Sequence, residues 1–322
     1  MATYHQDVLL DLLSDVSEAK KLELTNLKIT GATFNGLTDI FVLIHIRREQ
    51  GLALTIKTLD LSSNGLTKLP EDLFQELAFL NKLHLSRNRI RIESAKALSK
   101  ALMNNSPLTH LDLADNLIGS DGAKALSEAL MNNSSLTHLD LADNLIGSDG
   151  GKALSKMLEN NTTLTHLNLR WNWISSDGAT ALSEALMKNT TLTHIDFGGY
   201  PSISIKTLPL FLKNNALIEL KFDRTSFQTT EARALLEALD ATLELNRLRA
   251  EEDKKLAFLF GFKQSCLTKP SGEPQLISWI AEMAALEPKN EVKLKEQEER
   301  VASLTRDYQI LAKKVRRAIM KF

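Results

Sequence analysis

The stretch LTHLDLADNLIGSDG occupies residues 108–122, and the same fifteen letters return unchanged at residues 136–150. A looser version, LTHLNLRWNWISSDG, follows at residues 164–178. The starts at 108, 136 and 164 give two steps of 28 residues (136 − 108 and 164 − 136). A fixed internal period of roughly 20–50 residues is the signature of an array in which each copy stacks on its neighbours. The sequence therefore predicts a repeat protein.

Aligning the copies gives the template L-x-x-L-x-L-x-x-N-x-I/L. Full copies begin at Ile56, Leu80, Leu108, Leu136 and Leu164. Two later copies, which begin at Leu192 and Leu217, have Tyr200 and Thr225 in the asparagine slot. An imperfect first copy is Ala19-Leu22-Leu24-Leu27-Ile29, and a last one is Leu245-Leu248-Ala250. The template thus accounts for seven copies, or nine with the imperfect ones.

The text between the copies, such as GAKALSEALMNNSS at residues 122–135, places alanine and leucine at helical spacing. Each copy is therefore expected to be a short strand followed by a helix. The pattern resembles the 28-residue leucine-rich repeats of ribonuclease inhibitor and of NOD-like receptors, strongly over residues 56–230 and weakly over 16–55. This resemblance implies an α/β fold, a right-handed solenoid or horseshoe with a concave parallel sheet and convex helices.

The template positions have separate structural tasks. Leucines at positions 4 and 6 should point into the core, because strand side chains alternate and stacked copies bury what one copy cannot. The asparagine at position 9 should bond the backbone of adjacent turns, where no sheet satisfies it. This asparagine ladder consists of Asn64, Asn88, Asn116, Asn144 and Asn172. The Ser-Asp pairs at 120–121, 148–149 and 176–177 should start each helix, with serine as the cap and aspartate at the positive end of the helix dipole.

Three regions are expected along the chain. Residues 1–18 form an N-terminal helical cap, residues 19–253 the repeats, and residues 254–322 a C-terminal helical region. From Leu294 an apolar heptad runs to Phe322 and ends in a basic cluster. A helical hairpin within one chain satisfies this pattern. Weak self-association through residues 294–322 as a coiled coil also satisfies it.

Two polar columns are expected on the concave face, at template positions 3 and 5. Position 3 reads Lys82, His110, His138, His166, His194 and Glu219. Position 5 reads Asp60, His84, Asp112, Asp140, Asn168, Asp196 and Lys221. They can be a by-product of duplication, a polar recognition surface, or a metal or catalytic site. Metal ligands must converge on one point, whereas a column spreads them along a line. Catalysis by a histidine and an aspartate needs a nucleophile beside the histidine. We expect Thr109 and Thr137 on the other face of their strands, so neither is placed to serve as one.

Aromatic residues cluster where one copy departs from its neighbours. Positions 7, 8 and 10 are Ala, Asp and Leu in two copies, but Arg170, Trp171 and Trp173 in the next, with Tyr200 one step on. Trp, Tyr and Arg dominate the hot spots of protein interfaces. We therefore expect these four residues to anchor a protein partner on the concave face. Packing between loops is the alternative for Trp173.

The composition limits the function classes. A net charge of −1 does not suggest nucleic-acid binding, and no apolar run is long enough for membrane insertion. The acidic N-terminus does not read as a signal peptide, so a cytoplasmic location is expected. Asn-x-Ser/Thr triplets, which can be glycosylation sites, occur at Asn132, Asn160 and Asn189. Without a signal peptide they indicate polar loops rather than glycosylation. No cofactor or metal is expected.

A non-enzymatic binding scaffold is the function that these features favour. Some bacterial effectors join leucine-rich repeats to a cysteine-dependent ubiquitin ligase, but Cys266 has no acidic neighbour and no histidine follows His194. The chain resembles leucine-rich-repeat effectors that intracellular bacteria deliver into the host cytosol. Alternatives are an adaptor that recruits a ubiquitin ligase through the C-terminal helices, and a cytosolic inhibitor of the ribonuclease-inhibitor kind.

Overall fold

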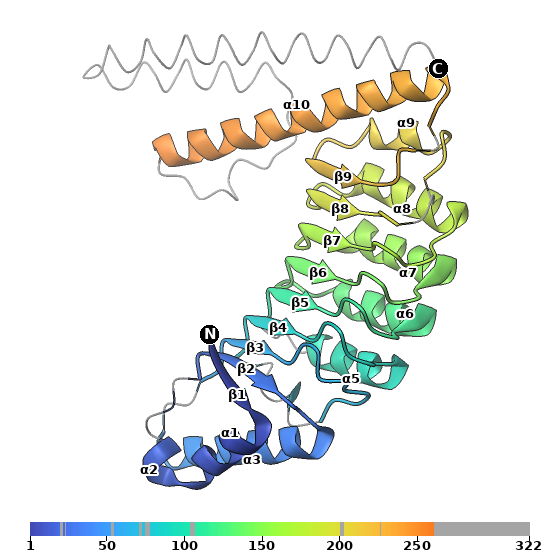
Figure 1. Ribbon diagram of the computed structural model, residues 1–322. Helices are drawn as coiled ribbons and strands as arrows, with labels where there is room; N and C mark the ends of the chain where they lie inside the picture. Colours follow the sequence, from blue (N-terminus) through green and yellow to red (C-terminus); the bar gives the residue numbers. More distant parts are fainter. Residues whose placement is uncertain are drawn as a thin grey trace, which may run out of the picture. The chain divides into compact units, whose positions relative to one another are not determined.

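The computed structural model describes residues 1–260 except 20–21, 23, 53–54, 71–72, 75–77, 104–106, 200–202 and 226, with only the backbone of 252–260. It divides into two compact units, Met1–Thr229 and Thr230–Phe322. In the first unit, nine strands among the described residues form one parallel sheet in chain order (Figure 1). They are β1 (Ala2–His5), β2 (Asn26–Thr30), β3 (Thr58–Asp60), β4 (Lys82–His84), β5 (His110–Asp112), β6 (His138–Asp140), β7 (His166–Asn168), β8 (His194–Asp196) and β9 (Glu219–Lys221).

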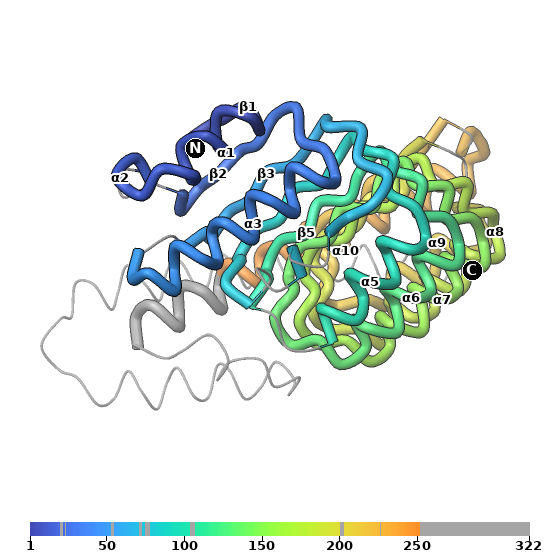
Figure 2. Tube along the Cα trace, turned by 90° about the horizontal axis from the view of Figure 1, so that it is seen from below, coloured from blue at the N-terminus to red at the C-terminus, as the bar shows by residue number. Residues whose placement is uncertain are grey.

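Helices connect the strands and cover one face of this sheet. They are α1 (Gln6–Ser14), α2 (Val16–Ala19), α3 (Phe34–Glu49), α5 (Ile92–Met103), α6 (Gly119–Leu130), α7 (Gly147–Asn160), α8 (Ser176–Lys188) and α9 (Leu208–Phe211). Helices α5 to α8 pack side by side (Figure 2). The α/β solenoid that the template predicts is therefore confirmed. We call the sheet face away from these helices the open face.

The register aligns the same template position in every strand. Leu111 lies beside Leu139, and Leu139 lies beside Leu167, while the residues before and after each leucine align in the same way. The leucines are buried and their two strand neighbours are half-buried. The alternation places position 4 in the core and positions 3 and 5 on the open face.

The position-9 asparagines form the expected ladder. Asn144 is fully buried, and its Nδ2 donates to the carbonyls of Leu113 (2.8 Å) and Leu141 (3.1 Å). Its Oδ1 accepts the amide of Ile118 at 3.4 Å. Corresponding bonds recur at Asn64, Asn88, Asn116 and Asn172. The side chain thus replaces the sheet hydrogen bonds where each strand ends.

A second asparagine ladder was missed by the sequence analysis. Buried asparagines recur after the helices, at Asn133, Asn161, Asn189 and Asn214. Asn161 Nδ2 donates to the Leu130 carbonyl in the preceding helix at 2.7 Å, and its Oδ1 accepts the Leu164 amide at 2.8 Å. Asn189 makes the same two bonds with the Leu158 carbonyl and the Leu192 amide. Each of these two asparagines follows a helix and connects the helix end of the preceding repeat to the start of the next repeat.

The N-terminal expectations need two corrections. Residues 2–5 form β1, which pairs with β2, so the helices α1 and α2 follow a strand. In β2, Leu27 aligns with Leu59, so template positions 1, 4 and 6 are Leu24, Leu27 and Ile29 rather than the expected Ala19, Leu22 and Leu24. Ala32 then takes the asparagine slot, and its amide bonds Asn64 Oδ1 at 2.9 Å.

Two further expectations fail at helix boundaries. Asp121, Asp149 and Asp177 do lie in first turns, but no side chain caps α6, α7 or α8. The expected last copy at residues 245–250 lies within α10 (Thr230–Phe260), where no strand forms. The expected hairpin and coiled coil, and Cys266, lie outside the described residues.

We predict that Asn161→Ala lowers the free energy of unfolding by about 2–3 kcal/mol. The substitution leaves the buried Leu130 carbonyl and Leu164 amide without their partner, and one such group costs about 1–3 kcal/mol. The matched control is Asn160→Ala, one residue earlier and exposed, which should change stability by about 0.5 kcal/mol or less. Urea denaturation followed by circular dichroism measures both. Equal effects of the two variants would contradict a structural role for the second ladder.

Candidate protein-binding face

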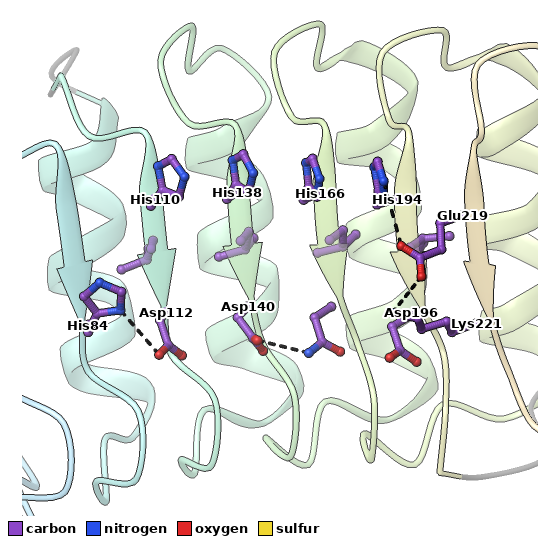
Figure 3. A pocket seen from close by; sticks show the side chains of 15 residues that line it. His84, His110, Asp112, His138, Asp140, His166, His194, Asp196, Glu219 and Lys221 are labelled. Carbon is purple, nitrogen blue, oxygen red and sulfur yellow. Dashed lines mark hydrogen bonds and ion pairs between the residues drawn. The ribbon is translucent and has the colours of Figure 1, made fainter. Parts of the chain in front are cut away.

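The open face carries the two polar columns side by side. Strands β5 to β8 each contribute a histidine at position 3 and an aspartate or asparagine at position 5 (Figure 3). These side chains line a groove of about 370 Å³ that runs from His84 on β4 to Glu219 and Lys221 on β9. The structure therefore brings the predicted histidines and aspartates together on one surface.

The four histidines form a stack of parallel rings. Ring centroids are 4.1 Å apart for His110 and His138, 4.0 Å for His138 and His166, and 4.1 Å for His166 and His194. The interplanar angles lie between 7° and 12°. In-register parallel strands impose this spacing, because identical side chains at one position sit one strand apart.

A threonine precedes each of these histidines and bonds its ring. Thr165 Oγ1 lies 2.9 Å from His166 Nδ1 and 3.0 Å from the Thr137 carbonyl oxygen. The same two contacts recur at Thr109, Thr137 and Thr193, and we call these four residues the threonine ladder. We expected Thr109 and Thr137 on the other face of their strands and did not predict these contacts between hydroxyl and ring.

Three rings of the column, those of His110, His138 and His166, have lowered pKa values that keep them neutral at pH 7. Burial, followed by the neighbouring histidines, lowers the pKa of His110 to about 4, with Lys82 contributing. Burial and the same kind of neighbours lower the pKa of His166 to about 4. Burial also lowers the pKa of His138. A charged stack would place like charges about 4 Å apart in a partly desolvated surface, which the pKa shifts avoid.

The aspartates of the second column have both a surface and a backbone role. Asp112 Oδ1 accepts the Ala114 amide at 3.0 Å, and Asp140 Oδ1 accepts the Ala142 amide at 2.9 Å. Burial raises the pKa of Asp140, helped by Asp112 and Asp196. Burial acts in the same direction on Asp112, but hydrogen bonds led by that from His84 outweigh it and lower the pKa. Part of the aspartate pattern therefore serves the strand ends.

Close contacts between side chains of opposite type lie at the two ends of the groove. Lys221 Nζ lies 2.7 Å from Glu219 Oε1, and Glu219 Oε2 lies 3.8 Å from His194 Nε2. At the other end, His84 Nδ1 lies 3.7 Å from Asp112 Oδ2 (Figure 3). Among the described residues that line the groove, Lys221 is the one lysine or arginine. The groove between these ends therefore has carboxylates and neutral imidazoles but no cation.

The aromatic cluster lies in the loop that leaves β7. Trp171 and Trp173 are 41% and 59% exposed, and both have a left-handed backbone with φ of 59° and 55°. The Arg170 guanidinium carbon lies 5.6 Å from the Trp171 ring centroid. The Trp171 ring lies over Gly199, where an added Cβ would come within 2.4 Å of the ring. Tyr200, the fourth member of the predicted cluster, lies outside the described residues.

The equivalent positions of neighbouring repeats explain why this loop is distinctive. Position 8 is left-handed at Asp115 and Asp143 as well, with short polar side chains that tolerate this conformation. Position 10 carries exposed Leu117 and Leu145 before Trp173. A left-handed backbone costs a bulky residue roughly 1–2 kcal/mol. The two tryptophans therefore hold a strained conformation with much of their surface in solvent.

The geometry of the columns does not suit nucleophilic or metal chemistry. The short contact to the Thr137 carbonyl engages the Thr165 hydroxyl proton, whereas a nucleophile must donate that proton to its base. A histidine with a pKa of about 4 is also a weak base at neutral pH. Within the described part of the chain, no group of three or more His, Cys, Asp or Glu residues could hold a metal ion. The same part contains no helix that is long and apolar enough to cross a membrane.

We predict that the histidine column makes stability fall as the pH drops from about 6.5 to about 4. The ring pKa values are depressed on folding, so the unfolded chain binds protons in this window that the folded chain does not. Above pH 6.5 neither the folded nor the unfolded chain binds protons at these rings, so the column no longer makes stability depend on pH. Thermal unfolding across this range should show a shallower fall for His138→Gln/His166→Gln than for the wild type. Parallel curves for the two proteins would refute the assignment.

Comparison with known proteins identifies the repeat type. Two models, both described as leucine-rich repeat, match the chain at residues 55–118 and at residues 132–155 and 160–183. A search of curated proteins finds no match.

Three similar solved structures have TM-scores below 0.5. The leiomodin-1 actin-binding site 2 has 24% identity over 49% of this chain and 95% of its own, with a TM-score of 0.44. The tropomodulin C-terminal domain of Caenorhabditis elegans has 17% identity over 50% and 97%, with a TM-score of 0.41. TLR13 in complex with ssRNA13 has 22% identity over 69% of this chain but 32% of its own, with a TM-score of 0.38. The segments that the two leucine-rich-repeat models match contain β3 to β7. This chain therefore carries an array of leucine-rich repeats.

Proposed function

We propose that the chain is a non-enzymatic scaffold that binds a protein partner through the open face and the adjoining loop of Arg170, Trp171 and Trp173. Leucine-rich-repeat domains are generally scaffolds for protein–protein interaction. The observation that carries the proposal is the pair of exposed, left-handed tryptophans in one repeat. They stand where the preceding repeat has Asp143 and Leu145.

Strain and exposure together support a binding role for the two tryptophans. A strained backbone persists where the surroundings over-determine it, and such positions cluster at ligand contacts. Tryptophan and arginine also dominate interface hot spots because they bury a large area with few rotatable bonds. Position 10 also carries exposed leucines, Leu117 and Leu145, in the two preceding repeats. A partner that covers this row would bury it against the loops.

The open face supplies the polar part of the proposed interface. The histidine and aspartate columns extend across β4 to β9, next to the β7 loop that carries the tryptophans. Neutral imidazoles cost little to desolvate compared with charged ones, so a partner can cover them. A standard interface buries roughly 800 Å² per partner, an area that several adjacent strands and loops can supply.

The biological setting that we propose follows from resemblance. The array resembles the repeats of effectors that intracellular bacteria deliver into host cells, so the proposed partner is a host cytosolic protein. The repeats also resemble those of ribonuclease inhibitor, so the alternative setting is a cytosolic inhibitor or regulator of that kind. Recruitment of a ubiquitin ligase would involve residues 254–322 and predicts that deletion of this region abolishes ligase binding while the open face still binds its partner.

We predict that Arg170→Ala/Trp171→Asp/Trp173→Leu abolishes capture of the principal partner from a eukaryotic cytosolic lysate. The variant restores the letters ADNL of the two preceding repeats, so folding is preserved while the aromatic anchors are removed. Its melting temperature should equal or exceed that of the wild type, because shorter side chains occupy the left-handed positions. Quantitative mass spectrometry of material captured on the full chain provides the readout.

The matched control is a substitution at an exposed position outside the β7 loop. Asn160→Ala lies at the exposed end of α7 and should leave capture unchanged. Equal capture by the wild type and the triple variant, with both proteins folded, would exclude the β7 loop as the binding anchor.

A further inference from the structure

The threonine ladder determines which nitrogen of each histidine carries the proton. A threonine hydroxyl has one hydrogen to donate. Thr165 Oγ1 has an acceptor carbonyl oxygen at 3.0 Å and a ring nitrogen, His166 Nδ1, at 2.9 Å. If the hydroxyl donated to the ring, two oxygen atoms would face each other at 3.0 Å without a proton between them. Both contacts are favourable when the hydroxyl donates to the carbonyl and Nδ1–H donates to the hydroxyl.

This arrangement leaves Nε2 of the neutral His110, His138 and His166 rings without a proton and able to accept a hydrogen bond. The Thr–His contact recurs in the three successive strands β5 to β7 at 2.8–2.9 Å, so these three rings have the same tautomer. The rings line the groove, one strand spacing apart (Figure 3). Beside them lie the carboxylates of Asp112, Asp140 and Asp196. The open face therefore offers hydrogen-bond acceptors in two parallel rows.

The charges of the groove favour a cationic ligand. Its one described lysine, Lys221, is paired with Glu219 at 2.7 Å. Lys82 lies at the β4 end of the histidine column, and Arg170 lies over the Trp171 ring. An acidic or acceptor-rich segment would meet carboxylates and lone pairs along the whole groove. A segment rich in arginine or lysine would supply donors and positive charge to both rows.

We propose that the histidine column and its neighbouring aspartates form the recognition site for an extended, arginine- or lysine-rich segment of the partner. The threonine ladder prepares this site by holding the imidazoles of His110, His138 and His166 with Nε2 as the acceptor. The inference rests on the proposed function, because it names the chemistry of the partner at the open face. From β4 to β9 the groove crosses five strand spacings, roughly 24 Å, which about seven residues of an extended chain can span.

The tautomer can be tested in the free protein. Long-range ¹H–¹⁵N correlation spectra at neutral pH distinguish a protonated ring nitrogen from a bare one. We expect Nδ1–H and bare Nε2 for His138 and His166 in the wild type. Thr137→Val/Thr165→Val removes the hydroxyls with little change in shape, and the spectra should then show a mixture of tautomers. Nε2–H as the main form in the wild type would overturn the proposal.

The recognition step can be tested with a defined probe. We would measure fluorescence anisotropy of a labelled peptide of about seven residues, alternating arginine and glycine, on the full chain. A peptide with glutamate in place of arginine is the charge control and should not bind. His138→Phe/His166→Phe keeps two aromatic rings and the net charge at neutral pH but removes two acceptors. It should weaken binding about tenfold or more.

The variants separate specific recognition from general attraction. Because the histidines are neutral, attraction by net charge alone predicts no effect of His138→Phe/His166→Phe and a loss with Asp140→Asn. That result would overturn the proposal. Thr137→Val/Thr165→Val leaves every imidazole in place and should also weaken the arginine peptide, which covers the case in which the phenylalanine variant is unstable.

The outcome is independent of the loop cluster. The triple variant Arg170→Ala/Trp171→Asp/Trp173→Leu should still bind the arginine peptide. Partner capture that depends on the loop, together with no peptide binding by the wild type, would retain the proposed function and reject this inference. Binding of the arginine peptide by the wild type, together with partner capture that does not depend on the loop, would support this inference and reject the loop as the binding anchor.

Discussion

Parallel pairing in register is the constraint from which the remaining features of the first unit follow. Each strand from β3 to β9 contributes three residues to the sheet, and the middle one is buried against the residue at the same position in its neighbours. A shift by one residue would exchange the core leucines for histidine or aspartate. The repeat length fixes this register, because each helix must return the chain to the same point beside the previous strand.

Strands of three residues satisfy few backbone groups, so side chains must provide the remaining bonds. Asn144 at a strand end bonds the Leu113 carbonyl and the Ile118 amide, both in the preceding repeat. Asn161 at a helix end donates to Leu130 of the preceding repeat and accepts from Leu164 of the next. Thr165 adds a bond to the Thr137 carbonyl at the strand start. Each repeat is thus bound to its neighbour at the start and end of the strand and at the helix terminus, in addition to the apolar core.

Sequence patterns predicted the parts of the structure that depend on spacing. The leucines and Asn64 to Asn172 follow from the template, because every copy places them alike. Asn161 was missed because an asparagine in a polar, helix-terminal stretch reads as loop composition unless its burial is known. The first copy was misaligned because Leu22 and Leu24 imitate template leucines, and pairing with β3 decides in favour of Leu24 and Leu27. The position of Thr165 depends on a side-chain rotation that spacing does not encode.

The open face repeats the same residues from strand to strand, whereas the β7 loop departs from the residues of its neighbours. Duplication of one strand makes a column automatically, so the presence of four histidines does not by itself indicate selection for binding. Their pairing with threonine is different, because each hydroxyl bonds both a backbone carbonyl and the ring and so defines which ring nitrogen carries the proton. At Trp171 the repetition is broken, and a residue poorly suited to its backbone replaces one that suits it. No property of the fold requires that exchange, whereas contact with a partner would offset its cost of roughly 1–2 kcal/mol.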